Sequence, residues 1–243
     1  MKIEFKKSLK LRNKLFRREH ELSNVWYTKA YKALKGKSPE AIKRGVRTMY
    51  TKIAKQTSEQ VEEDLELVVQ SLVDEFEKKT GITVDSSFVP GIAAVVMAGK
   101  LYKSKWTFDK ATKAIVDKYG NVVTVMVDND KDAEAILAVL NPNDSQYQHT
   151  VNTDDGTLYV PKIGAATSTL MRTTVEHGFQ EAIVQLAEIL EEEKNTEVMI
   201  RWISALEWNT CEVCEGRHNE LYRPEDLPLE HPNGQCEFCI EYT

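Results

Sequence analysis

The crowding of every cysteine at one end constrains this chain more than any other feature. Four cysteines, arranged as two CxxC pairs, lie in the last 33 of its 243 residues, and 21 residues separate the pairs. Two thiolates at CxxC spacing can bind one Zn²⁺ ion, because a tight turn points both sulfur atoms the same way. The pattern predicts one structural zinc ion per chain, bound by Cys211, Cys214, Cys236 and Cys239, with His231 as an alternative fourth ligand.

The segment between the two pairs is polar and offers few apolar side chains that could hold it in place. The start of the chain lacks the apolar core and small-residue cleavage site of a secretory signal, which favours reduced thiols over disulfides. We therefore expect metal binding to supply folding energy to residues 215–235. Four unrelated reduced cysteines are the alternative.

The net charge of −6 divides unevenly along the chain. Residues 1–55 hold 17 Lys and Arg against 4 Asp and Glu, whereas the remainder holds 15 against 34. This asymmetry predicts an anionic partner such as DNA for the basic part, although a solvated helix beside the chain's own acidic body has the same composition. The candidate DNA contacts are Lys6, Lys7, Lys10, Arg12, Lys14, Arg17 and Arg18.

Apolar side chains alternate with these cations at helical spacing, notably Leu11, Leu15 and Leu22. We interpret residues 1–56 as a basic helical arm whose leucine side packs on another protein and whose lysine side lies toward DNA. On this interpretation, deletion of residues 1–20 removes most DNA binding and leaves the zinc-binding domain folded.

Residues 57–156 are predicted to form a helical central region with a short strand. A helix is expected to begin at Thr57, to bury a stripe from Val61 to Phe76, and to end at Gly81. The β-branched run at 122–127 predicts the strand, and the turn-forming residues of 141–156 predict a loop.

The remaining part, residues 157–243, is predicted to be a small α+β domain. Its pattern indicates a long helix over 163–194, followed by strands near 198–204 and 238–242, where apolar and polar residues alternate. The expected fold class is therefore mostly α-helical, with a small α+β C-terminal domain clamped by a Cys/His zinc site. No run of 18 apolar residues occurs, so no membrane span is expected.

Part of the C-terminal segment is similar to an enzyme motif. The triplet from His218 to Glu220, followed by the second cysteine pair, resembles the H-x-E and P-C-x-x-C motifs of zinc deaminases. Gln235 stands where that pattern has proline, and the first cysteine pair would have no role. No phosphate-binding glycine loop, nucleophile elbow or HExxH motif occurs either. We expect neither an enzyme nor a small-molecule substrate.

Residues 160–243 resemble the C-terminal domain of phage minor head proteins, the head morphogenesis or phage Mu protein F-like family. The matching residues are Arg172-Thr173-Thr174 in a helix, Trp202 on a strand, Thr210-Cys211-x-x-Cys214, Gly216 at a turn, His231-Pro232-Asn233, and Cys236. Gly234 and Gln235 replace a Cys and an Arg of the pattern, and Cys239 is additional to it. The family pattern implies that His231 is the fourth ligand, whereas the symmetric CxxC spacing favours Cys239.

The resemblance implies a structural component of a tailed-phage head, present inside the virion near the portal vertex. Such proteins associate with the portal protein or the major capsid protein during assembly in the host cytoplasm, and some contact packaged DNA. The alternative is a zinc-ribbon nucleic-acid-binding protein of cellular origin, in which the zinc unit itself contacts nucleic acid. Residues 188–243 hold 14 acidic against 4 basic residues, a composition that repels phosphate and disfavours this alternative.

Overall fold

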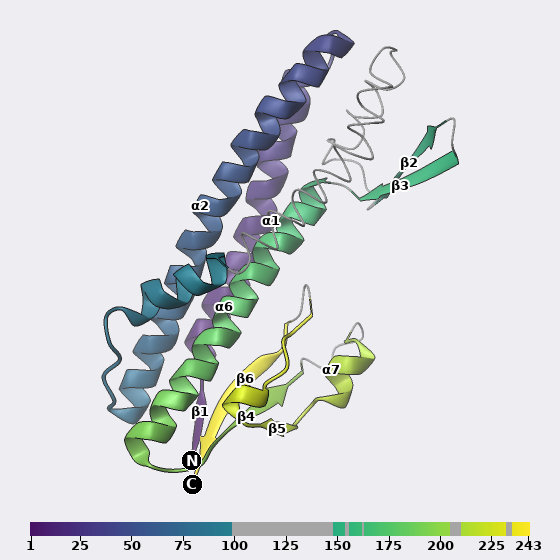
Figure 1. Cartoon of the computed structure of the whole chain (residues 1–243). Helices are drawn as coiled ribbons and strands as arrows, with labels where there is room; N and C mark the ends of the chain where they lie inside the picture. Colours follow the sequence, from purple (N-terminus) through teal and green to yellow (C-terminus); the bar gives the residue numbers. More distant parts are fainter. Residues whose placement is uncertain (99–147, 154–155, 162, 205–209, 232–234) are drawn as a thin grey trace. The chain divides into compact units, whose positions relative to one another are not determined.

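The computed structural model of the chain describes residues 1–98, 148–153, 156–161, 163–204, 210–231 and 235–243. It is mostly helical, with a small antiparallel sheet that contains the C-terminal strands (Figure 1). The long helices are α1 (Lys6–Leu34), α2 (Pro39–Thr80) and α6 (Ile163–Lys194). Among the described residues, no helix is both long enough and apolar enough to cross a membrane.

Contacts divide the chain into two compact units. The first comprises Met1–Phe16, Val61–Met97 and Arg172–Thr243 and is called the sheet unit below. The second comprises Arg17–Gln60 and Ala98–Met171. This grouping differs from the linear division at residues 56 and 156 that the sequence suggested, because each long helix continues from one unit into the other.

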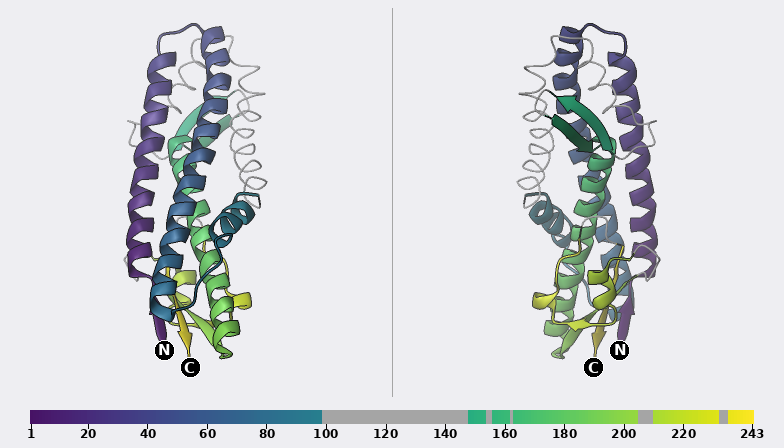
Figure 2. Two further views of the ribbon diagram at one scale, coloured as in Figure 1. Left: turned by 90° about the vertical axis from the view of Figure 1, so that its left-hand side faces the viewer. Right: turned by 90° about the vertical axis from the view of Figure 1, so that its right-hand side faces the viewer.

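The four-stranded sheet joins the two ends of the chain. Its strands are β1 (Lys2–Glu4), β4 (Val198–Ile203), β5 (Leu221–Tyr222) and β6 (Glu237–Tyr242), in the order β1-β6-β4-β5 with all neighbours antiparallel. Figure 2 shows the two termini side by side at this sheet. Residues 1–16 are therefore part of the sheet unit, and their interpretation as a separate arm is corrected.

One face of this sheet forms an apolar core. Ile3, Ile240 and Ile200 are cross-strand neighbours, and all three are buried. Trp202 and Phe238 form the next pair along the same face, with their rings edge to face at 5.0 Å between centroids. The alternate residues of β4 and β6 point to the opposite face, as the period of a strand requires.

The helices of the sheet unit contribute the rest of its core. The predicted stripe on α2 is confirmed, because all its members are buried: Val61, Leu65, Val68, Leu72 and Phe76. Gly178 of α6 lies against Leu65, and an added Cβ there would clash with the Leu65 side chain. Gly81 has a φ of +73° and follows the last residue of α2, so it ends that helix as predicted.

The predicted helix at 163–194 and both predicted C-terminal strands are confirmed by α6, β4 and β6. The predicted helix start at Thr57 is wrong, because α2 begins at Pro39 and continues through that position. Ser38 precedes this helix, and its Oγ accepts a 3.4 Å hydrogen bond from the Ala41 amide. Thr57 lies buried in the middle of the helix instead of capping its end.

The second unit contains a β-hairpin formed by β2 (Gln148–Thr153) and β3 (Gly156–Pro161). The predicted loop over 141–156 is therefore wrong for residues 148–153, where Thr150, Val151 and Thr153 supply the β-branched residues typical of strands. In the same unit, the buried Tyr27 hydroxyl is 2.9 Å from Thr167 Oγ1. The strand predicted at 122–127 lies outside the described residues.

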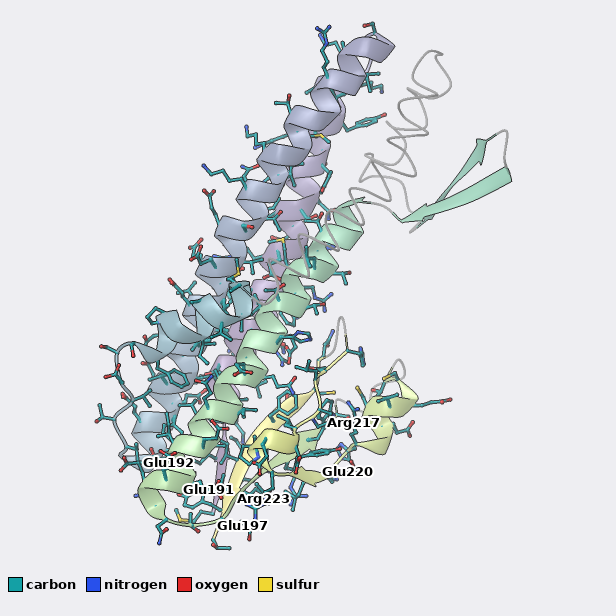
Figure 3. All side chains as sticks on the ribbon, viewed as in Figure 1. Glu191, Glu192, Glu197, Arg217, Glu220 and Arg223 are labelled. Carbon is teal, nitrogen blue, oxygen red and sulfur yellow. The ribbon has the colours of Figure 1, made fainter. Side chains whose placement is uncertain are left out.

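Charged residues connect the short elements between β5 and β6 to α6. Arg223 precedes the 3₁₀ helix η1 (Pro224–Asp226), and its guanidinium lies 2.7 Å from Glu197 and 3.5 Å from Glu191 (Figure 3). Arg217 lies over the Trp202 ring at 5.0 Å from the ring centroid. The Arg223 contacts hold the start of the chain that leads to the second cysteine pair, whereas the Arg217 contact lies before β5 and is made with β4.

Candidate metal centre

The first cysteine pair lies at the start of the short helix α7 (Glu212–Gly216). Cys211 is the N-cap residue, and its Sγ accepts a 3.4 Å hydrogen bond from the Cys214 amide. An N-cap residue and the third residue of its helix lie on the same side of the first turn, so both sulfur atoms face one point. Cys211 is partly exposed, whereas Cys214 is 2% exposed.

Helix α6 positions the segment that carries Glu230 and His231. Gln180 Nε2 donates a 2.7 Å hydrogen bond to the Pro228 carbonyl, and Gln180 Oε1 accepts a 3.1 Å bond from the Glu230 amide. The ring of His177 adds a 3.1 Å contact between Nε2 and the Glu230 carbonyl. Because α6 holds this backbone at three points, the side chains of Glu230 and His231 are presented to α7.

The side chains from these two segments form a Cys/Cys/His cluster that could hold a metal ion. The candidate ligand atoms of Cys211, Cys214 and His231 all lie within 4.8 Å of one another, and Cys211 Sγ is 3.2 Å from His231 Nε2. A second group with the same spacing comprises Cys214, Glu230 and Cys236, all buried. Cys214 belongs to both groups, so the donors form one continuous site.

No protein-family model, curated protein or solved structure matches the chain. The resemblance to phage minor head proteins therefore depends on the sequence motifs alone.

Cys239 belongs to neither donor group. It lies within β6, opposite Glu4 on one side and Arg201 on the other, on the sheet face that alternates with Phe238 and Ile240. Burial raises the pKa of its thiol to about 11. The all-sulfur set that the symmetric spacing favoured is not assembled, because three residues along a strand reverse the direction of a side chain.

Ser204 follows β4 and lies between the two cysteine segments. Its hydroxyl donates to the Cys214 carbonyl, and Cys236 Sγ is 3.9 Å from its Oγ. Its amide donates a 3.1 Å hydrogen bond to His218 Nδ1. His218, which the deaminase pattern would use at a metal, therefore supports the backbone at the end of β4.

Arg12 of α1 supports the second cysteine segment from within the core. The side chain is 1% exposed, with Nη1 2.8 Å from Glu176 Oε1 and 2.9 Å from the Cys236 carbonyl oxygen. Its guanidinium also lies over the Phe179 ring at 5.0 Å. Arg12 is therefore removed from the candidate DNA contacts. Nothing in the sequence indicated that Arg12 is buried, because Glu176 and Cys236 lie 164 and 224 positions away from it in the chain.

The thiols experience different local fields. The amide of Cys214 lowers the pKa of Cys211. Burial raises the pKa of Cys214 to about 11, and burial together with the charge of Glu230 raises that of Cys236 above its usual value. Without a cation, the thiols of Cys214 and Cys236 hold their protons. A divalent cation reverses this preference, because it stabilises the thiolates and displaces those protons.

The exposed cations at the start of α1 form a narrower set than the sequence predicted. Lys7, Lys10 and Lys14 are exposed at helical spacing on one face, which is called the lysine face below. Lys6 is exposed but pairs with Glu4 at 2.9 Å. Arg17 is exposed, and Arg18 is partly buried.

The opposite side of α1 is occupied by the chain's own core. Leu9, Leu15 and Phe16 are buried, and Leu11 and Leu22 are partly buried. The apolar residues that the sequence assigned to docking on another protein therefore already have partners within this chain. We withdraw the prediction that this leucine side is a docking surface.

Proposed function

We propose that the chain is a structural minor head protein of a tailed phage, with one structural zinc ion in its C-terminal part. The observation that carries this proposal is the proximity of Cys211, Cys214 and His231. These residues come from two separate segments of the family-like pattern, and that pattern uses a histidine where the CxxC symmetry would use Cys239. A chance resemblance gives no reason for the two segments to meet with metal-ligand atoms facing one another.

The proposed zinc ion cross-links α7 to the segment between η1 and β6. Thiolate and imidazole are ligands that zinc prefers in structural sites, and the chemistry that the ion supplies is this cross-link. Purified, reduced protein should contain one zinc per chain by elemental analysis. A stoichiometry near zero in folded protein would contradict the zinc part of the proposal.

The proposed role in the phage head is tested with its neighbours. We expect a portal gene upstream and a scaffold or capsid gene downstream of the gene for this chain. The portal protein encoded there should retain the purified chain on an affinity column, and an unrelated portal should not. Mass spectrometry of DNA-filled heads should detect the chain at low copy number. Its absence from heads and from portal complexes would contradict the assignment.

The proposed contact with packaged DNA uses the lysine face. Three neutralised phosphates correspond to a slope of log affinity against log salt of about −3. Substitution of Lys7, Lys10 and Lys14 by Gln should remove most of this slope. A matched control replaces Lys52, Lys55 and Lys78, exposed cations of α2, in the same way. An equal loss in both variants would mean that DNA binding is not specific to the lysine face.

A further inference from the structure

Glu230 is a buried carboxylate whose second oxygen has no hydrogen-bond partner in the described part of the chain. Glu230 is 2% exposed, and its Oε1 accepts a 2.7 Å hydrogen bond from the Cys236 amide. Oε2 is buried and lacks any such bond. Gln180 holds the backbone of Glu230, and the hydrogen bond from the Cys236 amide holds its carboxylate in this position.

No ion pair joins Glu230 to a cation among the described residues, and the two thiols beside it can become thiolates only when a metal ion binds. Its carboxylate lies within 4.8 Å of the sulfur atoms of Cys214 and Cys236, and both of these residues are buried. Arg12, the buried cation that contacts Cys236, is already paired with Glu176. A buried carboxylate is costly unless it is paired with a cation or a metal ion.

We propose that Glu230 is a metal ligand and that its Oε2 binds the same ion as the thiolates of Cys214 and Cys236. Carboxylate oxygen is an accepted zinc donor beside cysteine and histidine. In this arrangement Cys214, Cys236 and Glu230 form the buried half of the centre, and one donor of its exposed half, Cys211 or His231, completes the four positions of a structural zinc site. The inference rests on the proposed zinc site and adds a donor that neither the CxxC spacing nor the family-like pattern contains.

The decisive variant is Glu230→Gln, because its amide oxygen can still accept the hydrogen bond from the Cys236 amide. A neutral amide is a poor zinc ligand, so zinc affinity, measured by competition with a chelating dye, should fall more than about 100-fold. Loss of an outer-shell partner costs about 10–100-fold. Glu237→Gln is the matched control, because Glu237 is exposed and follows Cys236 directly.

Cobalt substitution gives a readout that affinity alone does not. If Oε2 binds the ion, Glu230→Gln should shift the visible d–d bands of the Co²⁺ protein, while Glu237→Gln leaves them unchanged. Glu230→His provides a second variant, because imidazole can replace the carboxylate as a zinc ligand. Its zinc affinity should therefore be within about tenfold of the wild-type affinity.

These measurements distinguish a failure of the Glu230 assignment from a failure of the proposed zinc site. Wild-type protein that binds no metal would overturn both. Wild-type protein that binds one zinc, together with a Glu230→Gln variant of unchanged cobalt spectrum, would overturn the assignment of Glu230 alone. A fall in affinity below 100-fold that Glu230→His does not restore would also overturn it, since that result describes a carboxylate that only positions Cys236.

Discussion

The two cysteine pairs have the same spacing and different fates. In the first pair, Cys211 caps α7 and Cys214 lies in its first turn, so both sulfur atoms reach the donor cluster. In the second pair, Cys236 precedes β6 and Cys239 lies inside it, on the face away from the cluster. Three residues bring side chains together on a helical turn and separate them on a strand.

CxxC spacing is therefore evidence for a metal site only when the backbone between the cysteines forms a turn. The first pair supplies two donors from one local structure. The second supplies one donor, Cys236, and the other candidate donors, Glu230 and His231, come from earlier positions in the same segment. The second pair also depends on the start of the chain, because Arg12 donates a hydrogen bond to the carbonyl of Cys236.

The largest expected effect follows from removing the support of the second pair. Deletion of residues 1–16 removes β1 and five buried apolar side chains: Ile3, Phe5, Leu9, Leu15 and Phe16. At about 1.5–3 kcal/mol each, this burial amounts to about 8–15 kcal/mol, comparable to the whole stability of a domain. We expect the sheet unit to unfold and zinc binding to be lost, as measured by circular dichroism and metal analysis.

This result would reverse what the sequence alone suggested, in which deletion of residues 1–20 left the zinc-binding domain folded. The control is the substitution of Lys10 and Lys14 by Gln, since both are exposed and neither contributes to the core. A truncated protein that still unfolds cooperatively and binds one zinc would show that the N-terminal strand and helix are dispensable.

The second prediction compares the cysteines directly. Cys214 belongs to both donor groups, so Cys214→Ser should reduce the zinc content from one per chain to near zero. Cys236→Ser should also lower zinc content, because it removes a buried donor. The measurement is elemental analysis after gel filtration, with folding checked by urea denaturation. Full zinc content in Cys214→Ser would mean that the ion is not held where the two groups meet.

Sequence reasoning found the elements whose signals are local. The stripe on α2, the length of α6 and the alternation in β4 and β6 each depend on residues close together in the chain, and all are confirmed. The orientation of Cys239 could not be predicted reliably, because it depends on whether β6 begins at Glu237 or a few residues later. Glu230 gave no signal, since one glutamate among many acidic residues is distinguished only by burial.

The position of β1 was missed for a related reason. A strand of three residues is too short to show alternation, and its partner is the last strand of the chain. The basic composition of residues 1–55 suggested an arm, while every third or fourth residue of α1 is buried in the chain's own core. Charge counts describe what a helix shows to solvent and say nothing about what its other face contacts.

The third prediction tests the support from Arg12. Arg12→Met removes the guanidinium that forms a 2.8 Å ion pair with the buried Glu176, which should lower the free energy of unfolding by about 3–5 kcal/mol. The double variant Arg12→Met/Glu176→Leu should recover most of this loss, because both buried charges of the ion pair are then removed together. The unrecovered part should be about 1–3 kcal/mol, the cost of a buried carbonyl at Cys236 that has lost its donor. Urea denaturation with bound zinc measures all three proteins.

The smallest effect should come from Cys239, and it gives the sharpest comparison of the two pairs. The residue is 1% exposed, lies in a strand and has no place in either donor group, so it behaves as a small core side chain. Cys239→Val introduces a β-branched residue that suits a strand, and the free energy of unfolding should change by less than about 1.5 kcal/mol. Zinc content should stay at one per chain, and the sulfur-to-metal absorbance of the Co²⁺ protein should be unchanged. Cys236→Val, its matched partner, should lose zinc. If Cys239→Val loses zinc as well, Cys239 is a zinc ligand after all. The conclusion that β6 turns Cys239 away from the other donors would then be refuted.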